Sequence, residues 1–433
     1  MLQKSTIVKY YTNKRRLNKL NRKKKLKGNK GRIYYGYIMV AAIFFIITIT
    51  CGTIYCFGIF FSPLRSEFGW TSTQTSLAFS LYMVIHGLFY IVAGKINDSF
   101  GPRIVMTICG FFLGIGYLLM SRINALWQLY IVYGLILAIG MSGAFVPLIS
   151  TITKWFVKKR GLMTGICTAG VGVGTMIMPP VVSWLISISG WRQSFIIIGA
   201  GSLVLIVVAA QFLKRKPTDI TQSIYGTDKA DKMATQRQTK GFSLRQAVWT
   251  SQFWILSAAF FGFGFYLQSV MVHIVPYAIN MGISLTRATL VMAFIGGSST
   301  AGRLIMGATA GKIGNKPVAI VSFILMTLAA CILILSKEVC MLYLFAFIFG
   351  FSYGGLVTIQ SLLVADLFGL RAHGLIFGVL TFIVTIGGGI GPLVAGYIFD
   401  LSSSYYILFL VFLAVSATGF VLISLLRPTA DFT

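Results

Sequence analysis

Twelve apolar stretches follow one another between residues 35 and 426 of this 433-residue chain. Each has about 20 residues, the length with which a helix crosses the roughly 30 Å hydrocarbon core of a bilayer. The composition agrees, because 57% of the residues are hydrophobic and only 11% are charged, whereas a soluble domain has about 25% charged residues. The sequence therefore predicts an all-α membrane protein with twelve transmembrane helices. The predicted spans are residues 35–61, 73–96, 104–121, 126–153, 162–186, 191–213, 253–277, 288–309, 318–335, 341–363, 375–399 and 405–426.

The basic residues are distributed unevenly between the two sides of the predicted helices. The chain has 37 Lys and Arg residues and 9 Asp and Glu residues, which gives a net charge of +28. If the N-terminus lies in the cytoplasm, 31 of the basic residues fall in cytoplasmic segments and five fall on the opposite side. Lys and Arg are enriched in the cytoplasmic loops of membrane proteins. We therefore expect a multi-pass protein of the cell membrane, plasma or inner, with both termini in the cytoplasm.

Residues 1–33 form a strongly basic tail before the first predicted span. Thirteen basic residues and no acidic residue lie within its first 32 positions. Near a cytoplasmic leaflet each Lys or Arg gains about 1 kcal/mol from anionic lipid. We expect the tail to be cytoplasmic and to contact anionic lipids, and we do not expect nucleic acid as a partner. The sequence by itself leaves nucleic-acid binding or organellar targeting by this tail open.

The second half of the chain repeats the first at a constant offset of 213 residues. The offset relates prolines and basic residues as well as glycines, so it is more than a coincidence among common glycines. The predicted segments are a tail at 1–33, a six-helix bundle at 34–213, a cytoplasmic linker at 214–249, a second six-helix bundle at 250–427 and a short cytoplasmic C-terminus at 428–433. Parallel copies of six helices are typical of transporters that rock around a central site. The matching pairs are Gly94 and Gly307, Gly101 and Gly314, Arg103 and Lys316, Gly161 and Gly374, Gly165 and Gly378, and Pro179 and Pro392.

A short motif between predicted spans two and three carries a resemblance to a known family. Gly94, Asp98, Gly101 and Arg103 form the pattern G-x-x-x-D-x-x-G-x-R. In this position the pattern resembles the signature of the major facilitator superfamily. The resemblance implies two pseudo-symmetric six-helix bundles, transport by alternating access and a gating role for the four motif residues. Further stretches are similar to one branch, the oxalate:formate antiporters and monocarboxylate transporters. They are residues 154–165, 273–278, 302–307 and 389–396.

Three features depart from the patterns of these families. The second copy of the motif has Gly311 where the first has Asp98, so only one copy keeps its acid. Oxalate:formate antiporters carry a lysine in span eleven, but residues 375–399 contain no cation, which disfavours a dianionic substrate. Animal-type monocarboxylate transporters have a lysine in span one and an aspartate before the span-eight arginine. The matching positions are Tyr55 and Ser299, so their scheme of proton coupling does not transfer to this chain.

Arg303 is the strongest candidate for a substrate-binding residue. It lies within the eighth predicted span, and a guanidinium at the centre of a membrane helix costs about 2.5 kcal/mol or more. No predicted span has an acidic residue in its interior that could pair with it. A substrate carboxylate would supply the missing partner, because the planar guanidinium binds a carboxylate through two parallel hydrogen bonds. The alternative is that the side chain extends along its helix toward the cytoplasm.

Three further residues are candidates for the same substrate site. His273 lies in span seven and can donate a hydrogen bond to a carboxylate or hydroxyl. Tyr353 in span ten and Tyr55 in span one offer hydroxyl groups. The resemblance places span seven and Tyr353 against the central cavity. The alternatives are a histidine satisfied by helix contacts and tyrosines that pack in the core or against lipid.

The repeat adds a candidate for proton coupling. The offset relates His86 to Ser299 and Tyr90 to Arg303, and residues four apart share a helix face. If the two bundles are pseudo-symmetric, His86 faces Arg303 across the centre. An imidazole titrates near neutral pH, so His86 and His273 are the proton-coupling candidates. A packed histidine between spans two and eleven is the alternative for His86.

The remaining reactive residues do not point to catalysis. The 3 histidines, 9 acids and 6 cysteines show no spacing typical of a catalytic triad or a metal site, so we expect no enzyme, cofactor or metal. We expect a secondary active transporter of small monocarboxylates such as lactate or pyruvate, with protons as the candidate coupling ion. The alternatives are a carboxylate exchanger of the oxalate:formate type and a non-transporting membrane sensor on the same fold.

Overall fold

The computed structural model describes residues 35–156, 160–215, 241–336, 338–369 and 372–427. The predicted tails at 1–33 and 428–433 and most of the linker at 214–249 lie outside the described residues. The described part is nearly all helical, and 11 of its helical segments are long and apolar enough to cross a membrane. The predicted fold class is therefore confirmed, whereas the exact number of twelve spans stays a prediction.

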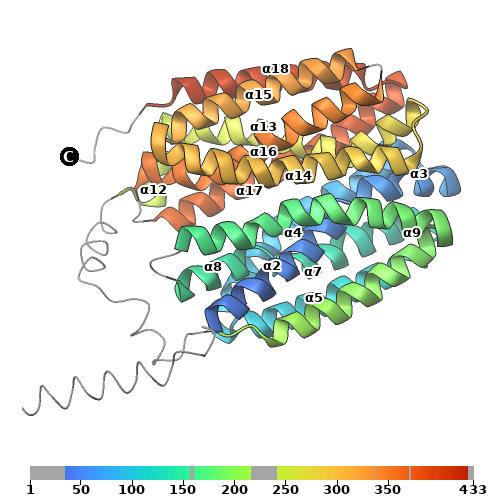
Figure 1. Ribbon diagram of the computed structural model, residues 1–433, viewed down its shortest axis with the longest axis horizontal. Helices are drawn as coiled ribbons and strands as arrows, with labels where there is room; N and C mark the ends of the chain where they lie inside the picture. The colour runs from blue at the N-terminus through green and yellow to red at the C-terminus, as the bar shows by residue number, and fades with distance from the viewer. Residues whose placement is uncertain (1–34, 157–159, 216–240, 337, 370–371, 428–433) are drawn as a thin grey trace, which may run out of the picture.

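The helices form two bundles that lie side by side, with their axes running in a common direction (Figure 1). The N-terminal bundle is shown in blue and green, and the C-terminal bundle in yellow to red. The first comprises α2 (Tyr35–Ile54), α3 (Phe57–Phe68), α4 (Ser72–Phe100), α5 (Pro102–Met120), α6 (Leu126–Leu129), the π-helix η1 (Tyr130–Leu137), α7 (Ala138–Ser142), α8 (Val146–Trp155) and α9 (Arg160–Gln211). The second comprises α12 (Leu244–Val248), α13 (Ser251–Asn280), α14 (Leu285–Ile313), α15 (Asn315–Leu335), α16 (Val339–Phe368), α17 (His373–Ser402) and α18 (Tyr406–Leu425).

The sequence repeat is also a structural repeat. Helices α4 and α14 both have 29 residues, and their first residues are 213 positions apart. Both end at a glycine with a positive φ, Gly101 at 88° and Gly314 at 92°, a conformation that side chains disfavour. Gly190 (φ 74°) and Ser403 (φ 51°) correspond in the same way. Because Ser403 follows the last residue of α17, the equivalent Gly190 marks the junction of the two helices contained in the 52 residues of α9.

The first predicted span is broken, which the apolar pattern of residues 35–61 does not reveal. Helix α2 ends at Ile54 and α3 begins at Phe57. The Tyr133 hydroxyl of η1 donates a hydrogen bond of 3.5 Å to the Ile54 carbonyl oxygen beside the break. A backbone group freed inside a membrane needs such a partner, and π-helical turns often occur at functional sites.

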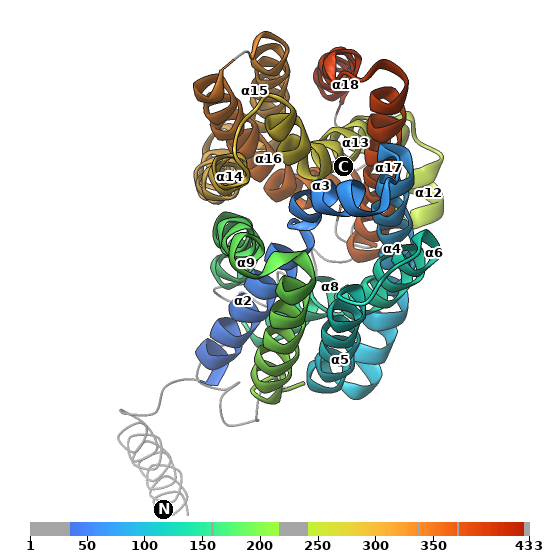
Figure 2. The same ribbon diagram turned by 90° about the vertical axis from the view of Figure 1, so that its right-hand side faces the viewer.

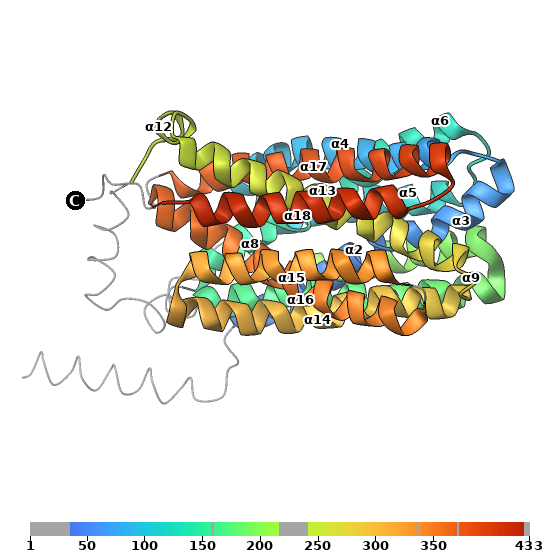
Figure 3. The same ribbon diagram turned by 90° about the horizontal axis from the view of Figure 1, so that it is seen from above.

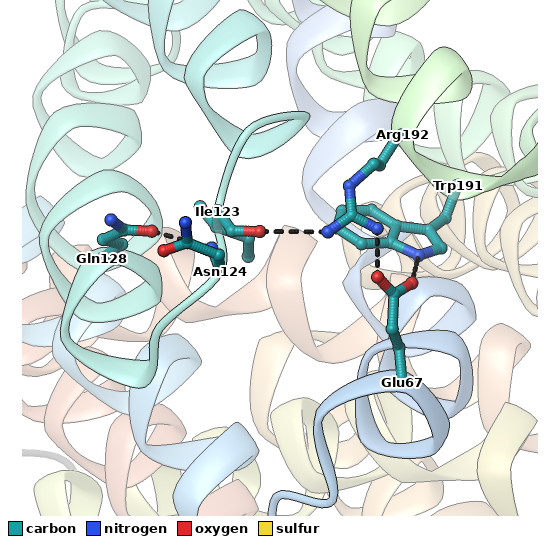
Figure 4. A network of polar contacts seen from close by, with 6 residues as sticks. All are labelled: Glu67, Ile123, Asn124, Gln128, Trp191 and Arg192. Carbon is teal, nitrogen blue, oxygen red and sulfur yellow. Dashed lines mark hydrogen bonds and ion pairs between the residues drawn. The ribbon is translucent and has the colours of Figure 1, made fainter.

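Helix α3 is fastened to the N-terminal bundle at its far end (Figure 4). The Glu67 carboxylate accepts hydrogen bonds from Trp191 Nε1, at 2.6 Å, and from the Arg192 guanidinium. Arg192 also donates to the Ile123 carbonyl oxygen at 3.3 Å. Nearer the middle of α3, the Phe60 ring stacks on Phe195 with 3.9 Å between ring centroids. These contacts make α3 part of the N-terminal bundle.

Two helix pairs form most of the contact between the bundles, α4 with α17 and α9 with α14 (Figure 2). We name the two ends of the molecule after the elements found there, the α3 end and the α12 end (Figure 3). Gly172 of α9 and Gly296 of α14 permit close contact, because a Cβ atom on either would overlap atoms of the other helix. Small residues commonly let membrane helices approach in this way.

The contact between α4 and α17 is present at the α3 end and ends toward the α12 end. At the α3 end, a side chain on Gly396 of α17 would overlap Ser72 and Ser76 of α4, and midway Gly87 lies against Thr385. Gly94 is seven residues beyond Gly87 on the same face of α4. Among the described atoms, none lies within 4 Å of a Cβ built on Gly94. The bundles therefore touch at the α3 end and part toward the α12 end.

Candidate substrate site at Arg303

Arg303 lies between the two bundles, well inside α14, and is 7% exposed. One guanidinium nitrogen donates a hydrogen bond of 3.0 Å to the Thr168 carbonyl oxygen of α9, in the other bundle. The second donates to the Tyr353 hydroxyl of α16 at 2.9 Å. The buried Nε has no hydrogen-bond partner in the described part of the chain. Among the side chains that the structure describes, no carboxylate pairs with this cation.

Tyr353 and Tyr55 both lie at the Arg303 site. The guanidinium carbon of Arg303 is 5.3 Å from the centre of the Tyr353 ring, a cation–π contact. Tyr55 lies at the break between α2 and α3, with its side chain close to those of Tyr353 and Arg303. The structure thus brings three of the four predicted substrate-binding residues together, from three helical segments and both bundles.

Cys51 is a member of this group that the sequence reasoning missed. Its carbonyl oxygen accepts a hydrogen bond of 3.4 Å from the Tyr55 backbone N–H group. Cys51 is half-buried and lies four residues before Tyr55. The spacing of four residues predicts that Cys51 and Tyr55 share a helix face. This spacing could have identified Cys51 from the sequence.

Glycines bring Tyr353 to Arg303 by letting α14 and α16 approach. A Cβ atom on Gly302 would overlap the Phe351 backbone, and one on Gly354 would overlap the Ser299 carbonyl oxygen. Both glycines are immediate chain neighbours of the two residues they bring together. The close helix contact therefore fixes the distance between guanidinium and hydroxyl.

The structure places His273 at the α3 end, between the bundles. Its Nε2 lies 3.0 Å from the Pro392 carbonyl oxygen and 3.1 Å from the Ser76 hydroxyl of α4, and its Nδ1 lies 3.1 Å from the Tyr405 hydroxyl. The Phe61 ring packs edge-on at 5.1 Å. None of these described partners is a partner of Arg303. His273 is thus surrounded by groups that join the bundles at this end.

His86 lies in an aromatic environment within the N-terminal bundle. Its ring is 5.1 Å from that of Tyr82 and 4.2 Å from that of Tyr90. The imidazole lies close to the Met141 backbone, and its buried Nδ1 has no hydrogen-bond partner among the described atoms. The described hydrogen bonds and ring contacts of His86 do not include Arg303.

The motif residues have distinct local roles. Gly101 ends α4 and starts α5, and Arg103 Nε donates a hydrogen bond of 2.8 Å to the Gln211 side chain. The repeat-related Lys316 likewise binds the Ser424 carbonyl oxygen at 2.8 Å. In each bundle this base therefore fastens the start of one helix to the end of another. The side chain of Asp98 lies outside the described residues, so its predicted gating role stays a prediction.

Comparison with known proteins gives the family. A family model described as Major Facilitator Superfamily matches residues 43–335 and 299–432. Monocarboxylate transporter 12 of Rattus norvegicus is 24% identical over 401 residues, which cover 87% of this chain and 82% of the relative. An MFS-type transporter of Escherichia coli (strain K12), YhjX, is 23% identical over 347 residues, which cover 79% of this chain and 82% of that protein.

A solved structure shows the same fold. It is a bacterial homolog of the human lysosomal transporter Spinster in an inward-facing and unoccupied conformation, with a TM-score of 0.66 and 16% sequence identity. The alignment covers 92% of this chain and 95% of that one. The family match, the membrane helices and this fold together agree with the motif at Gly94 to Arg103. The chain therefore belongs to the major facilitator superfamily and is a multi-pass membrane transporter, not an enzyme.

Proposed function

We propose that this transporter carries small monocarboxylates, such as lactate or pyruvate, and that Arg303 binds the carboxylate. The observation that carries the proposal is the buried guanidinium, which has no described carboxylate partner and an unpaired Nε. A carboxylate bound there would gain charge-assisted hydrogen bonds. The Tyr353 and Tyr55 hydroxyls can add contacts beside it. Several of the similar proteins are named monocarboxylate transporters.

A single negative charge suits this site better than two. Arg303 is the one basic residue in the interior of the predicted spans, because Lys95 and Arg192 each lie next to the end of a span, and residues 375–399 contain no second cation. A dianion such as oxalate would leave one charge unpaired in a site of low polarity, which is costly. This favours a monocarboxylate carrier over the oxalate:formate type of exchanger. The Arg303 contact across the bundles favours a transporter over a sensor that has lost transport.

The arrangement of the bundles supports alternating access. The bundles touch at the α3 end and part toward the α12 end, where no described atom fills the space beside Gly94. By the positive-inside rule the α12 end is cytoplasmic, so we assign an inward-open state to the molecule. Both chain termini, and the basic tail with its anionic lipids, would then lie on the cytoplasmic side of a cell membrane.

Uptake of radiolabelled acids into proteoliposomes tests the proposed function. We expect lactate-like monoanions to compete with one another for uptake and oxalate to compete poorly. Uptake with and without a pH gradient, and with and without acid loaded inside, separates proton symport from exchange. Stronger inhibition by oxalate than by every monocarboxylate would favour the exchanger instead. Binding without flux would favour the sensor.

Proton coupling is expected to depend on the two histidines within the membrane spans. Changing His86 or His273 to glutamine removes an imidazole, the side chain whose unperturbed pKa lies closest to neutral pH. We expect each change to flatten the pH dependence of uptake while exchange at equal pH continues. His373→Gln is the matched control, because His373 bonds the Ser361 carbonyl oxygen within its own bundle, at 2.9 Å. Proton-driven accumulation by the double variant would show that both histidines are structural.

A further inference from the structure

We propose that Gln268 of α13 forms the second pole of the substrate site and binds a hydroxyl group of the transported acid. This inference rests on the proposed function, because it takes the carboxylate to lie at Arg303. It adds Gln268 as a residue that determines specificity, at the repeat position equivalent to Tyr55. It also predicts that the transporter prefers hydroxy acids to acids of the same length without the hydroxyl.

The Gln268 side chain is an unpaired hydrogen-bonding group. Its Oε1 is buried and has no partner among the described atoms. Buried polar groups are nearly always hydrogen-bonded in native structures, so one that is not needs an explanation. The Nε of Arg303 is unpaired in the same way. Two such groups, an acceptor on α13 and a donor on α14, suit a ligand that binds both.

Gln268 lies where the bundles meet and not inside its own bundle. The Cβ position of Gly388 in α17 is 2.8 Å from Gln268 Cγ and 3.0 Å from Cε of Met83, which belongs to α4 in the other bundle. A glutamine from one bundle and a methionine from the other therefore both pack against Gly388, at the contact between the bundles. A polar group there is placed to meet a substrate held between the bundles.

The internal repeat relates Gln268 to Tyr55. The two residues are 213 positions apart, and the offset is well anchored here, because it also relates the helix prolines Pro63 and Pro276. Tyr55 contacts Tyr353, a residue of the opposite bundle that binds Arg303. In a pseudo-symmetric pair of bundles, the equivalent position faces the same centre from the other side. The repeat thus places Gln268 across the site from Tyr55.

The chemistry of the site selects a neutral donor. An amide oxygen accepts a hydrogen bond, so its ligand must present an O–H or N–H group. An ammonium group would need a nearby carboxylate to offset its desolvation. In the described part of the chain, the acids Glu67, Glu338, Asp366 and Asp400 lie at or near the ends of helices, and no described contact joins them to Arg303 or Gln268. A small monocarboxylate with a hydroxyl group suits both residues, because its carboxylate can bind Arg303 and its hydroxyl can bind Gln268.

Competition by acids of one carbon skeleton tests this inference. Butyrate and its 2-, 3- and 4-hydroxy derivatives would be compared as inhibitors of labelled uptake in proteoliposomes. For the wild-type protein we expect at least one hydroxy acid to inhibit at least about fivefold better than butyrate, as one satisfied hydrogen bond allows. The position of the preferred hydroxyl reports how far Gln268 lies from the bound carboxylate.

Gln268→Met keeps the length of the side chain and removes the acceptor. We expect butyrate and the hydroxybutyrates to inhibit uptake by this variant equally well. The hydroxy acids should inhibit it less than they inhibit the wild-type protein, whereas inhibition by butyrate should not change. Unchanged inhibition by butyrate also shows that the variant folds. Gln360→Met is the matched control, since Gln360 in α16 is also buried with an unpaired amide nitrogen. This control should keep the preference.

Two results would overturn the inference while the proposed function stands. One is a wild-type protein that is inhibited by butyrate and shows no preference for any hydroxybutyrate. The other is a Gln268→Met variant that retains the preference. If none of the acids inhibits uptake or is taken up, the proposed monocarboxylate function itself is wrong, and the assignment of Gln268 fails with it.

Discussion

Replacement of Arg303 by lysine is expected to lower uptake at least about tenfold while the amount of protein in the membrane stays the same. Lysine keeps the charge and loses the planar pair of donors that binds a carboxylate through two hydrogen bonds. It also cannot reach both the Thr168 carbonyl oxygen and the Tyr353 hydroxyl in the way the guanidinium does. A lost charge-assisted hydrogen bond of about 1.5 to 3 kcal/mol accounts for a change of this size.

Labelled uptake in proteoliposomes, normalised to the reconstituted protein, measures the effect. Arg287→Lys is the matched control, because Arg287 lies on the same helix with its side chain exposed at the α3 end. That variant should transport normally. Arg303→Ala should lose more activity than Arg303→Lys, since it removes the charge as well. Near-normal uptake by Arg303→Ala would exclude Arg303 as the carboxylate-binding residue.

Asp400→Asn is expected to shift the protein away from the state in which the α3 end is closed. The Asp400 carboxylate of α17 accepts hydrogen bonds from the backbone N–H groups of Ser72 and Thr73, at 2.9 and 2.7 Å, and from the Thr73 hydroxyl at 2.6 Å. These groups form the N-terminus of α4, in the other bundle. A carboxylate is favoured there by the unpaired N–H groups and the helix dipole.

The size of this shift is limited by the solvent exposure of Asp400. Exposed charges contribute little, so we expect a loss of about 1 kcal/mol, roughly a fivefold change in the ratio of the two states. A Ser72→Cys substitution in a protein without other cysteines would report opening of the α3 end. Ser72 is buried at this contact, so its replacement becomes accessible only when the contact opens. Its labelling by an impermeant thiol reagent should become faster in the Asp400→Asn variant.

Asp366→Asn serves as the matched control for this experiment. The Asp366 carboxylate accepts a hydrogen bond of 2.7 Å from Asn315, and both residues belong to the C-terminal bundle. Its loss should leave the labelling rate unchanged. If the Asp400→Asn variant, the Asp366→Asn variant and the protein without either substitution show equal labelling and equal uptake, Asp400 has no role in closing the α3 end.

Much of the fold and part of the site follow from the sequence by itself. The length and polarity of each apolar stretch are local properties of the sequence. An apolar segment of this length can cross a bilayer in few structures, of which the helix is one. The predicted helical class is therefore confirmed by the structure. The repeat offset of 213 residues likewise reappears in helix bounds and in the left-handed residues Gly190 and Ser403. The cost of a buried cation was enough to single out Arg303 before its neighbours were known.

Other features were decided only by tertiary contacts. The break between Ile54 and Phe57 lies beside a hydrogen bond from the Tyr133 hydroxyl, a partner about 80 residues away that no apolar pattern of residues 35–61 records. The α3-end contacts of His273 with Ser76, and of Asp400 with the start of α4, join segments that are distant in the chain. Hydropathy fixes which residues enter the membrane, because burial in lipid is a property of each segment. Which polar groups meet there is set by how the helices of two bundles pack, and this is a property of the whole fold.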